Sequence, residues 1–200
     1  KLNARQAYQA FNAQLLAEEA PAADETVLTS GKSYSNVFHA DGGNAAFSVM
    51  ANTLRGVYGT DVLLATANSF TGSVLQADYT KKMAASMIMP NGLLSRQRTM
   101  TGAELKELVR AYVEGCEGGF VPFNRGSLPV VSGIAVEVKE AGGSYTLTGI
   151  TRNGQPLRDD DTVTVTCLAT SKQMEALLAS ESGASEDGDA WVKDTWRDHV

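Results

Sequence analysis

Residues 101–113, Thr-Gly-Ala-Glu-Leu-Lys-Glu-Leu-Val-Arg-Ala-Tyr-Val, carry the clearest structural signal in the chain. The hydroxyl of Thr101 can accept a hydrogen bond from the backbone of Glu104, and the Glu104 side chain can accept one from the backbone of Thr101. This reciprocal arrangement is the capping box that begins many helices. Apolar residues then recur at helical spacing, which predicts a helix packed on one side. They are Leu105, Leu108, Val109, Tyr112 and Val113.

Before this helix, the sequence alternates between predicted helices and strands. Residues 42–58 have apolar residues at helical spacing and are expected to form a helix. Residues 80–87 are expected to form another helix, which stops before Pro90. Residues 61–67 are a short apolar run, which indicates a strand buried on both faces. Residues 94–100 are expected to form another strand, and the polar stretch 68–73 is expected to be a loop.

After the helix, the sequence indicates mainly β-structure. Residues 128–138 and 144–151 are expected to be β, and Asn153-Gly154 is typical of a two-residue hairpin turn, because both positions need positive φ. In residues 162–167, Thr alternates with Val or Cys, as in a strand. Helices and strands that alternate first and then give way to a cluster of strands favour an α+β fold, a mixed sheet with packed helices.

The two ends of the chain carry further predicted segments. Residues 2–19 are expected to be a helix and residues 20–24 a linker, so the chain divides into residues 1–24 and a main domain of residues 25–200. The first helix is either a connector between two domains or a simple packed N-terminal helix. Residues 191–199 are expected to form a last short helix.

The bulk composition excludes several classes of protein. Two hundred residues of ordinary apolar content fit one domain with a real core. The net charge of −6 argues against a general nucleic-acid binder, which needs a basic surface to meet phosphates. No apolar run is long enough to be a membrane span. A small anionic ligand remains compatible with this charge, because a few backbone N–H groups can hold a phosphate.

Residues that bind metals or form disulfides are few. Cys116, Cys167, His39 and His199 show no Cys-x-x-Cys or His-x-x-x-His spacing, so we expect no metal site and no cofactor in this chain. A disulfide between the two cysteines is possible, but no pattern supports it. The acidic residues Glu181, Glu186, Asp187 and Asp189 are expected to lie in a solvated loop, and residues 187–194 lack the alternating oxygen ligands of a calcium loop.

Several short motifs resemble, in order and spacing, the C-terminal domain of the 5′-nucleotidase family. The helix that begins at Thr101 resembles the family's Leu-Thr-Gly-x-x-Leu-Lys stretch, and residues 90–92 stand in the place of its Pro-Phe-Gly. Residues 131–136 are similar to its Val-Ser-Gly-Leu-x-Val strand, and the resemblance extends over about residues 44–170. Further matches are residues 53–55 with its Ala-Leu-Arg, Asp61-Val62 with its Asp-Ile, residues 153–157 with its Asn-Gly-x-Pro-Leu turn, and residues 161–165 with its Lys-Thr-Tyr-Thr-Val strand.

The resemblance implies a division of labour between two domains. In the family, an N-terminal metallophosphoesterase domain binds two divalent metal ions and hydrolyses the phosphate ester, and the C-terminal domain supplies the nucleoside pocket. The expected partners are therefore that N-terminal domain and a small nucleotide or nucleoside, in a bacterial protein located in the periplasm, in the cell wall or outside the cell. The metal-ligand motifs of the first domain are missing here, so we expect no catalytic residue and no hydrolysis by this chain alone.

The family's pocket motifs match this sequence position by position. Its Asn-Gly-Gly-Gly-Ile-Arg loop corresponds to residues 68–73, where Ser73 replaces the Arg that reaches towards phosphate. Asn91 replaces the aromatic of Pro-Phe-Gly, and Thr170 stands near the second aromatic; each lost base-stacking contact is worth roughly 1–3 kcal/mol. The motif-matched candidates for substrate binding are Asn68, Gly72, Ser73, Asn91, Gly92, Gly133 and Thr170.

Several roles stay open at this level. Asn68 is either a ligand or a turn residue. Phe70, Phe120 and Phe123 either replace the lost stacking contacts or pack their loops against the core, and Arg125 could restore a positive charge. For the function, the first hypothesis is a substrate-recognition domain with altered ligand choice. The second is a non-catalytic interaction or scaffold domain, and the third is a domain of a sulfur-compound or cyclic-nucleotide hydrolase of the same superfamily.

Overall fold

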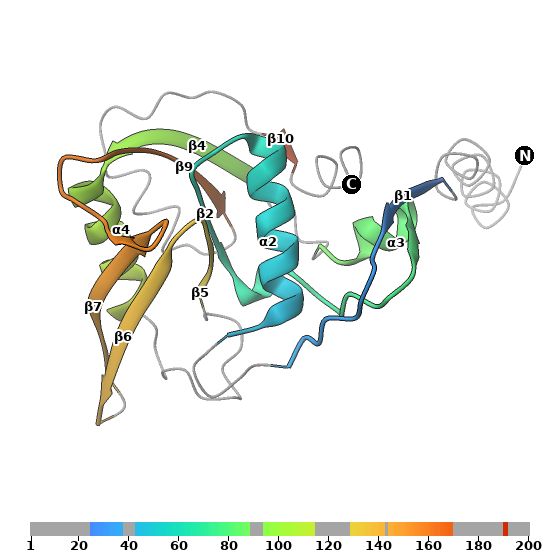
Figure 1. Ribbon diagram of the computed structural model, residues 1–200, viewed down its shortest axis with the longest axis horizontal. Coiled ribbons are helices and arrows are strands. Elements are labelled where there is room, and N and C mark those ends of the chain that lie inside the picture. Colours follow the sequence, from blue (N-terminus) through green and yellow to red (C-terminus); the bar gives the residue numbers. More distant parts are fainter. Residues whose placement is uncertain are drawn as a thin grey trace, which may run out of the picture.

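The computed structural model describes residues 25–37, 43–88, 94–114, 129–142, 144–169 and 190–191 (Figure 1). Its helices are α2 (Ala45–Tyr58), α3 (Lys81–Ser86) and α4 (Gly102–Glu114), with one 3-10 turn, η1 (Ala67–Ser69). Its strands are β1 (Thr26–Thr29), β2 (Val62–Thr66), β3 (Asp78–Thr80), β4 (Leu94–Thr101), β5 (Pro129–Ser132), β6 (Ala135–Ala141), β7 (Ser144–Arg152), β8 (Gln155–Pro156), β9 (Thr162–Ala169) and β10 (Ala190–Trp191).

A five-stranded mixed sheet forms the centre of the described structure. Its strand order is β10-β4-β9-β2-β5, with β2 parallel to β9 and the other neighbouring strands antiparallel. The remaining strands form a two-stranded pair, β1-β3, and a three-stranded sheet, β6-β7-β8. This mixed sheet with packed helices confirms the predicted fold class.

Strand β2 separates two hydrophobic cores, because all five of its side chains are buried and they alternate between the faces of the sheet. Leu63 and Ala65 pack with α2, whereas Val62 and Leu64 pack with α4. In Figure 1, α2 crosses in front of the sheet, and α4 lies to its left near β6 and β7. The prediction of a strand buried on both faces is therefore confirmed.

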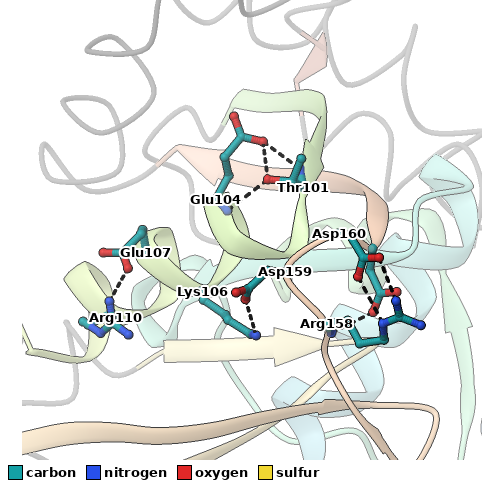
Figure 2. Close-up of polar contacts among 9 residues, drawn as sticks. Thr101, Glu104, Lys106, Glu107, Arg110, Arg158, Asp159 and Asp160 are labelled. Carbon is teal, nitrogen blue, oxygen red and sulfur yellow. Dashed lines mark hydrogen bonds and ion pairs between the residues drawn. The ribbon is translucent and has the colours of Figure 1, made fainter.

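Helix α4 begins and packs as its sequence predicts. The backbone N–H of Glu104 donates to the Thr101 hydroxyl at 3.2 Å, and the N–H of Thr101 donates to the Glu104 carboxylate at 2.6 Å (Figure 2). These bonds satisfy donors that the helix itself leaves unpaired. The five apolar residues of the predicted stripe are all buried: Leu105, Leu108, Val109, Tyr112 and Val113.

The start of α4 lies against the segment that connects β8 to β9. Gly102 N–H donates to the Asp161 carbonyl at 2.7 Å, and Ala103 N–H donates to the Asp159 carbonyl at 3.2 Å. A Cβ on Gly102 would lie 1.9 Å from the Arg158 carbonyl oxygen, so this contact requires glycine. Figure 2 shows the Lys106 ammonium on the next turn reaching the Asp159 carboxylate, at 2.7 Å.

The stretch 128–138, expected to be β, is two strands in two different sheets. β5 belongs to the central sheet and β6 to the three-stranded one, and the chain turns between them at Gly133, with φ of 87°. The turn at Asn153-Gly154 is confirmed, since both residues have positive φ and Arg152 pairs with Gln155. Helices α2 and α3 begin after the side-chain caps Asn44 and Thr80.

Other predictions fall near or outside the limits of the described residues. Trp191, expected to begin a helix, lies instead in strand β10, where it pairs with Leu94, so the prediction is wrong at this residue. Cys167 carries a free, buried thiol, and burial raises its pKa to about 12. The expected helices at 2–19 and beyond Trp191, the acidic run 181–189 and Cys116 lie outside the described residues.

Candidate functional site

One side of the central sheet, which we call the candidate edge, contains the carboxyl ends of β2 and β9 and the amino ends of β4 and β5. β2 and β9 run parallel, with Leu64 opposite Cys167, so their carboxyl ends point the same way. β4 begins at this edge because Leu94 pairs with Ala169, and β5 begins there because Pro129 pairs with Thr66. Ligand sites in α/β sheets form beyond the carboxyl ends of parallel strands, so this edge is the candidate site.

Asn68 stands at this edge on η1, directly after β2. The turn is held by the N–H of Thr66, which donates to the Ser69 hydroxyl at 3.3 Å, and by the N–H of Phe70, which donates to the Ala67 carbonyl. The Asn68 side chain is exposed and makes no hydrogen bond with any residue that the structure describes. Its φ is not in the left-handed region, so the local backbone does not require asparagine.

Gly72 and Ser73 follow on the same loop, which we call the β2–β3 loop (residues 67–77). Gly72 is exposed with φ of 76°, and no atom lies within 4 Å of where its Cβ would stand. The Ser73 hydroxyl accepts a hydrogen bond from Asn36 N–H at 3.2 Å. The residue that stands in the place of the family's arginine is thus bonded within the protein, and residues 67–77 contain no Lys or Arg.

Backbone hydrogen bonds hold the β2–β3 loop on two sides. Thr71 N–H donates to the Met87 carbonyl at 2.8 Å, after α3. On the other side, Tyr34 and Val74 exchange two backbone hydrogen bonds of 2.6 and 3.1 Å. The loop is therefore positioned before any ligand arrives, which lowers the entropy that binding must remove.

Phe70 points into the protein and not towards the candidate site. Its side chain is buried, and its ring centroid lies 5.7 Å from that of Phe47 on α2. The hypothesis that Phe70 replaces a lost stacking contact is wrong, because its ring faces are used by the core. Phe120, Phe123 and Arg125, proposed for similar roles, lie outside the described residues.

Gly133 lies at the opposite end of β2 from Asn68. Ser132 pairs with Leu63, near the start of β2, and a Cβ on Gly133 would lie 2.0 Å from the Asp61 carbonyl oxygen. Five strand residues separate the two ends, about 16 Å at the usual rise. Asn68, Gly72 and Ser73 thus lie on the loop that leaves the carboxyl end of β2, whereas Gly133 lies at the other end of that strand. Asn91, Gly92 and Thr170 lie outside the described residues.

Metal ligation and membrane insertion find no support within the described part of the chain. No group of three or more His, Cys, Asp or Glu residues there is arranged to hold a metal ion. No helix among the described residues is long and apolar enough to span a membrane.

Known structures match this architecture, although no family model matches the sequence and no curated protein matches it in sequence. A 5′-nucleotidase precursor of Thermus thermophilus matches 94% of this chain with a TM-score of 0.67 and 14% identity, over 39% of its own length. The NAD nucleotidase of Haemophilus influenzae matches 95% with a TM-score of 0.68 and 16% identity, over 37% of its length. This is the fold of a 5′-nucleotidase C-terminal domain.

The match is confined to one part of each larger protein. A sulfate thiohydrolase of Thermus thermophilus also matches, with a TM-score of 0.66, 11% identity and coverage of 96% of this chain but 35% of that one. The chain therefore spans less than two fifths of the length of these three proteins and matches only the C-terminal part of the 5′-nucleotidases. At such identities, the likeness shows the fold alone.

Within this 5′-nucleotidase C-terminal fold, several motif residues cluster at the amino end of β2, away from the candidate site. Asp61 accepts hydrogen bonds from the Thr164 N–H at 2.9 Å and hydroxyl at 3.0 Å, and it pairs with Arg152. Arg55 Nε donates to the Ser132 hydroxyl at 2.8 Å. The bond from the Thr164 backbone is the largest cause that lowers the pKa of Asp61. These motif residues join the strands at the end of β2 where Gly133 touches the Asp61 carbonyl, opposite to the end where Asn68 lies.

Sequence reasoning missed Asn36, which binds Ser73 through its backbone and thereby positions the β2–β3 loop. No local pattern identifies it, because a backbone N–H is available at any residue except proline. The contact joins positions 37 residues apart and depends on how the chain folds back.

Proposed function

We propose that this chain is the substrate-recognition domain of a 5′-nucleotidase-like metallophosphoesterase, whose separate N-terminal domain binds two divalent metal ions and hydrolyses nucleotides. One observation carries the proposal: the chain has the fold of the C-terminal part of proteins described as a 5′-nucleotidase and an NAD nucleotidase. The parent protein is a hydrolase under this proposal, and its location outside the cytoplasm follows from the family resemblance.

The β2–β3 loop supports the recognition role. Asn68 offers an exposed amide, which can both donate and accept hydrogen bonds, at the carboxyl end of β2. The same loop lacks the family's arginine, and Ser73 in its place is bonded to Asn36. We therefore propose that the ligand is a nucleoside or nucleotide held in a pocket that has diverged from the usual purine clamp.

Hydrolysis belongs to the proposed N-terminal domain and not to this chain. A two-metal mechanism needs ligands that hold two ions a few ångströms apart, and the described residues contain no such cluster. We expect the purified chain to release no phosphate from AMP in the presence of divalent metal ions. Phosphate release that depends on added metal and follows the chain through purification would contradict this.

Ligand binding is tested by calorimetric titration of the full chain with adenosine, AMP, a cyclic nucleotide and a nucleotide sugar. Saturable binding of any of them supports the recognition role. Asn68→Ala should weaken that binding by about five- to 150-fold, which corresponds to the roughly 1–3 kcal/mol lost with a bonded polar partner, and leave the melting temperature unchanged. The control is Gln155→Ala, which removes an exposed amide from β8, away from the candidate edge.

A second function, a non-catalytic interaction or scaffold domain, is favoured by two observations. Phe70 is buried against Phe47, so it does not act as an aromatic plate. The Ser73 hydroxyl already accepts a hydrogen bond from Asn36, so it offers a ligand only its O–H and no positive charge. A folded chain that binds none of the four ligands would favour this second function. The match to a sulfate thiohydrolase favours keeping the third hypothesis, in which the parent protein is a sulfur-compound hydrolase. The upstream coding sequence would distinguish this parent from a nucleotidase.

A further inference from the structure

Residues 26–36 run antiparallel to residues 73–80, which comprise the end of the β2–β3 loop and β3. We call residues 26–36 together with residues 73–80 the ribbon. It starts where β1 pairs with β3 and ends at the Asn36–Ser73 hydrogen bond. Between these ends, Ser30 N–H donates to the Ala77 carbonyl at 2.9 Å, Gln76 N–H donates to the Ser33 hydroxyl at 2.9 Å, and Tyr34 and Val74 pair through their backbones.

The two ends of the ribbon have different attachments. Beyond Ser73, the Asn36 carbonyl accepts a hydrogen bond from the Asn44 side chain at 2.8 Å, and the same side chain caps α2. Ala46 N–H also donates to the Ser35 carbonyl at 3.1 Å. One end is thus bonded to the first turn of α2, whereas the other begins just after the predicted linker, residues 20–24. Figure 1 shows β1 beside α3, and the chain from β1 running to the start of α2.

Gly72 divides the β2–β3 loop into a fixed part and a part that belongs to the ribbon. Before it, Phe70 is buried and Thr71 is bonded to Met87. After it, Ser73 is bonded to the opposite half of the ribbon. Gly72 itself is exposed, has φ of 76° and has open space where a Cβ would stand, which are the properties of a hinge position.

We propose that the ribbon is a positioning device, through which the segment upstream of Thr26 sets the position of Gly72 and Ser73 at the candidate site. An antiparallel ladder shares its hydrogen bonds along its length, so a displacement of β1 must either carry residues 73–80 with it or open the ladder. Under the proposed function, on which this inference rests, the upstream segment leads to the catalytic domain. A change in the arrangement of the two domains would then change the position of Gly72 and Ser73.

The test compares two neighbouring hydroxyls on the full 200-residue chain. The Thr29 hydroxyl donates across the ribbon to Asp78 at 2.6 Å, whereas the Ser30 hydroxyl donates to Lys32 of its own segment at 2.7 Å. Thr29→Val should speed the hydrogen exchange of the amides of Asn36 and Val74, at the far end, about fivefold, because one lost hydrogen bond weakens the whole ladder. The control variant, Ser30→Ala, should leave both rates unchanged.

The reverse experiment starts from the loop. Ser73→Ala removes the acceptor of the Asn36 N–H and should speed the exchange of the Ser30 amide, at the β1 end, by a similar factor. Faster exchange confined to the residues beside each substitution would overturn the proposal, since the contacts would then open independently. The readout needs no ligand. A chain that binds none of the four ligands but transmits the change refutes the proposed function alone. A chain that binds one of them but transmits nothing refutes the role of the ribbon alone.

Discussion

At the residue scale, two glycines and one carboxylate form contacts between segments that are far apart in the sequence. Gly102 touches the Arg158 carbonyl, and Gly133 touches the Asp61 carbonyl, each closer than any Cβ would allow. Asp61 in turn binds both Thr164 and Arg152. Side-chain volume and charge at these points therefore act on contacts between segments that are far apart in the sequence.

Replacing Gly102 with alanine should lower the free energy of unfolding by about 2–3 kcal/mol, because backbone has to shift to relieve the overlap. Urea unfolding monitored by circular dichroism measures this. Gly56→Ala is the matched control, since Gly56 lies inside α2 with open space around it. There the change should stabilise the chain by about 0.5–1 kcal/mol, the difference in helix propensity. Loss of stability at Gly56 with none at Gly102 would contradict the assignment.

Asp61 should make stability depend on pH in the acid range. Its hydrogen bonds lower its pKa below the ordinary value of 3.8, so its contribution is fully present above that value. The contribution is lost as the pH falls through the lower pKa of the folded state. The melting temperature of Asp61→Asn should therefore fall less than that of the unchanged chain between pH 5 and pH 2. Parallel curves would show that Asp61 does not contribute.

At the element scale, α4 depends on a start that its own sequence encodes. The capping box between Thr101 and Glu104 needs only residues within one helical turn, and the structure contains both of its bonds. Figure 2 shows that its ion pairs are side-chain contacts around this start and along the helix, such as Glu107 with Arg110. Exposed pairs of this kind contribute little, so the cap, the buried stripe and the contacts of Gly102 and Ala103 with the segment before β9 account for the position of the helix.

Thr101→Ala should lower the free energy of unfolding by about 1 kcal/mol, because the Glu104 N–H loses its acceptor. Thr101→Ser keeps the hydroxyl and should change stability by less than about half of that. Chemical denaturation of the two variants side by side checks the difference. Equal losses in both would assign the effect to the methyl group of Thr101 and not to the cap.

At the scale of the whole molecule, β2 joins two cores that share no face of the sheet. Leu63 belongs to the core with α2 and Leu64 to the core with α4, and both are almost fully buried. Because the two side chains project from consecutive residues of one strand, loss of packing on either face displaces the same backbone. We therefore expect the two cores to unfold together.

Leu63→Ala and Leu64→Ala should each lower the free energy of unfolding by about 2–5 kcal/mol. Hydrogen exchange of slowly exchanging amides in α2 and α4 should rise by the same factor in either variant. The comparison of the two helices within each variant is the internal control. An increase limited to the helix on the mutated side would show two independently stable halves.

The sequence alone determined the features whose causes lie within a few residues. The capping box at Thr101, the positive-φ turn at Asn153-Gly154 and the apolar run of β2 all follow from such local patterns. The tertiary structure alone decided the break at Gly133, the inward direction of Phe70, the strand at Trp191 and the bond between Asn36 and Ser73. Each of these needs two segments brought together by the whole fold, and no pattern within one segment carries that information.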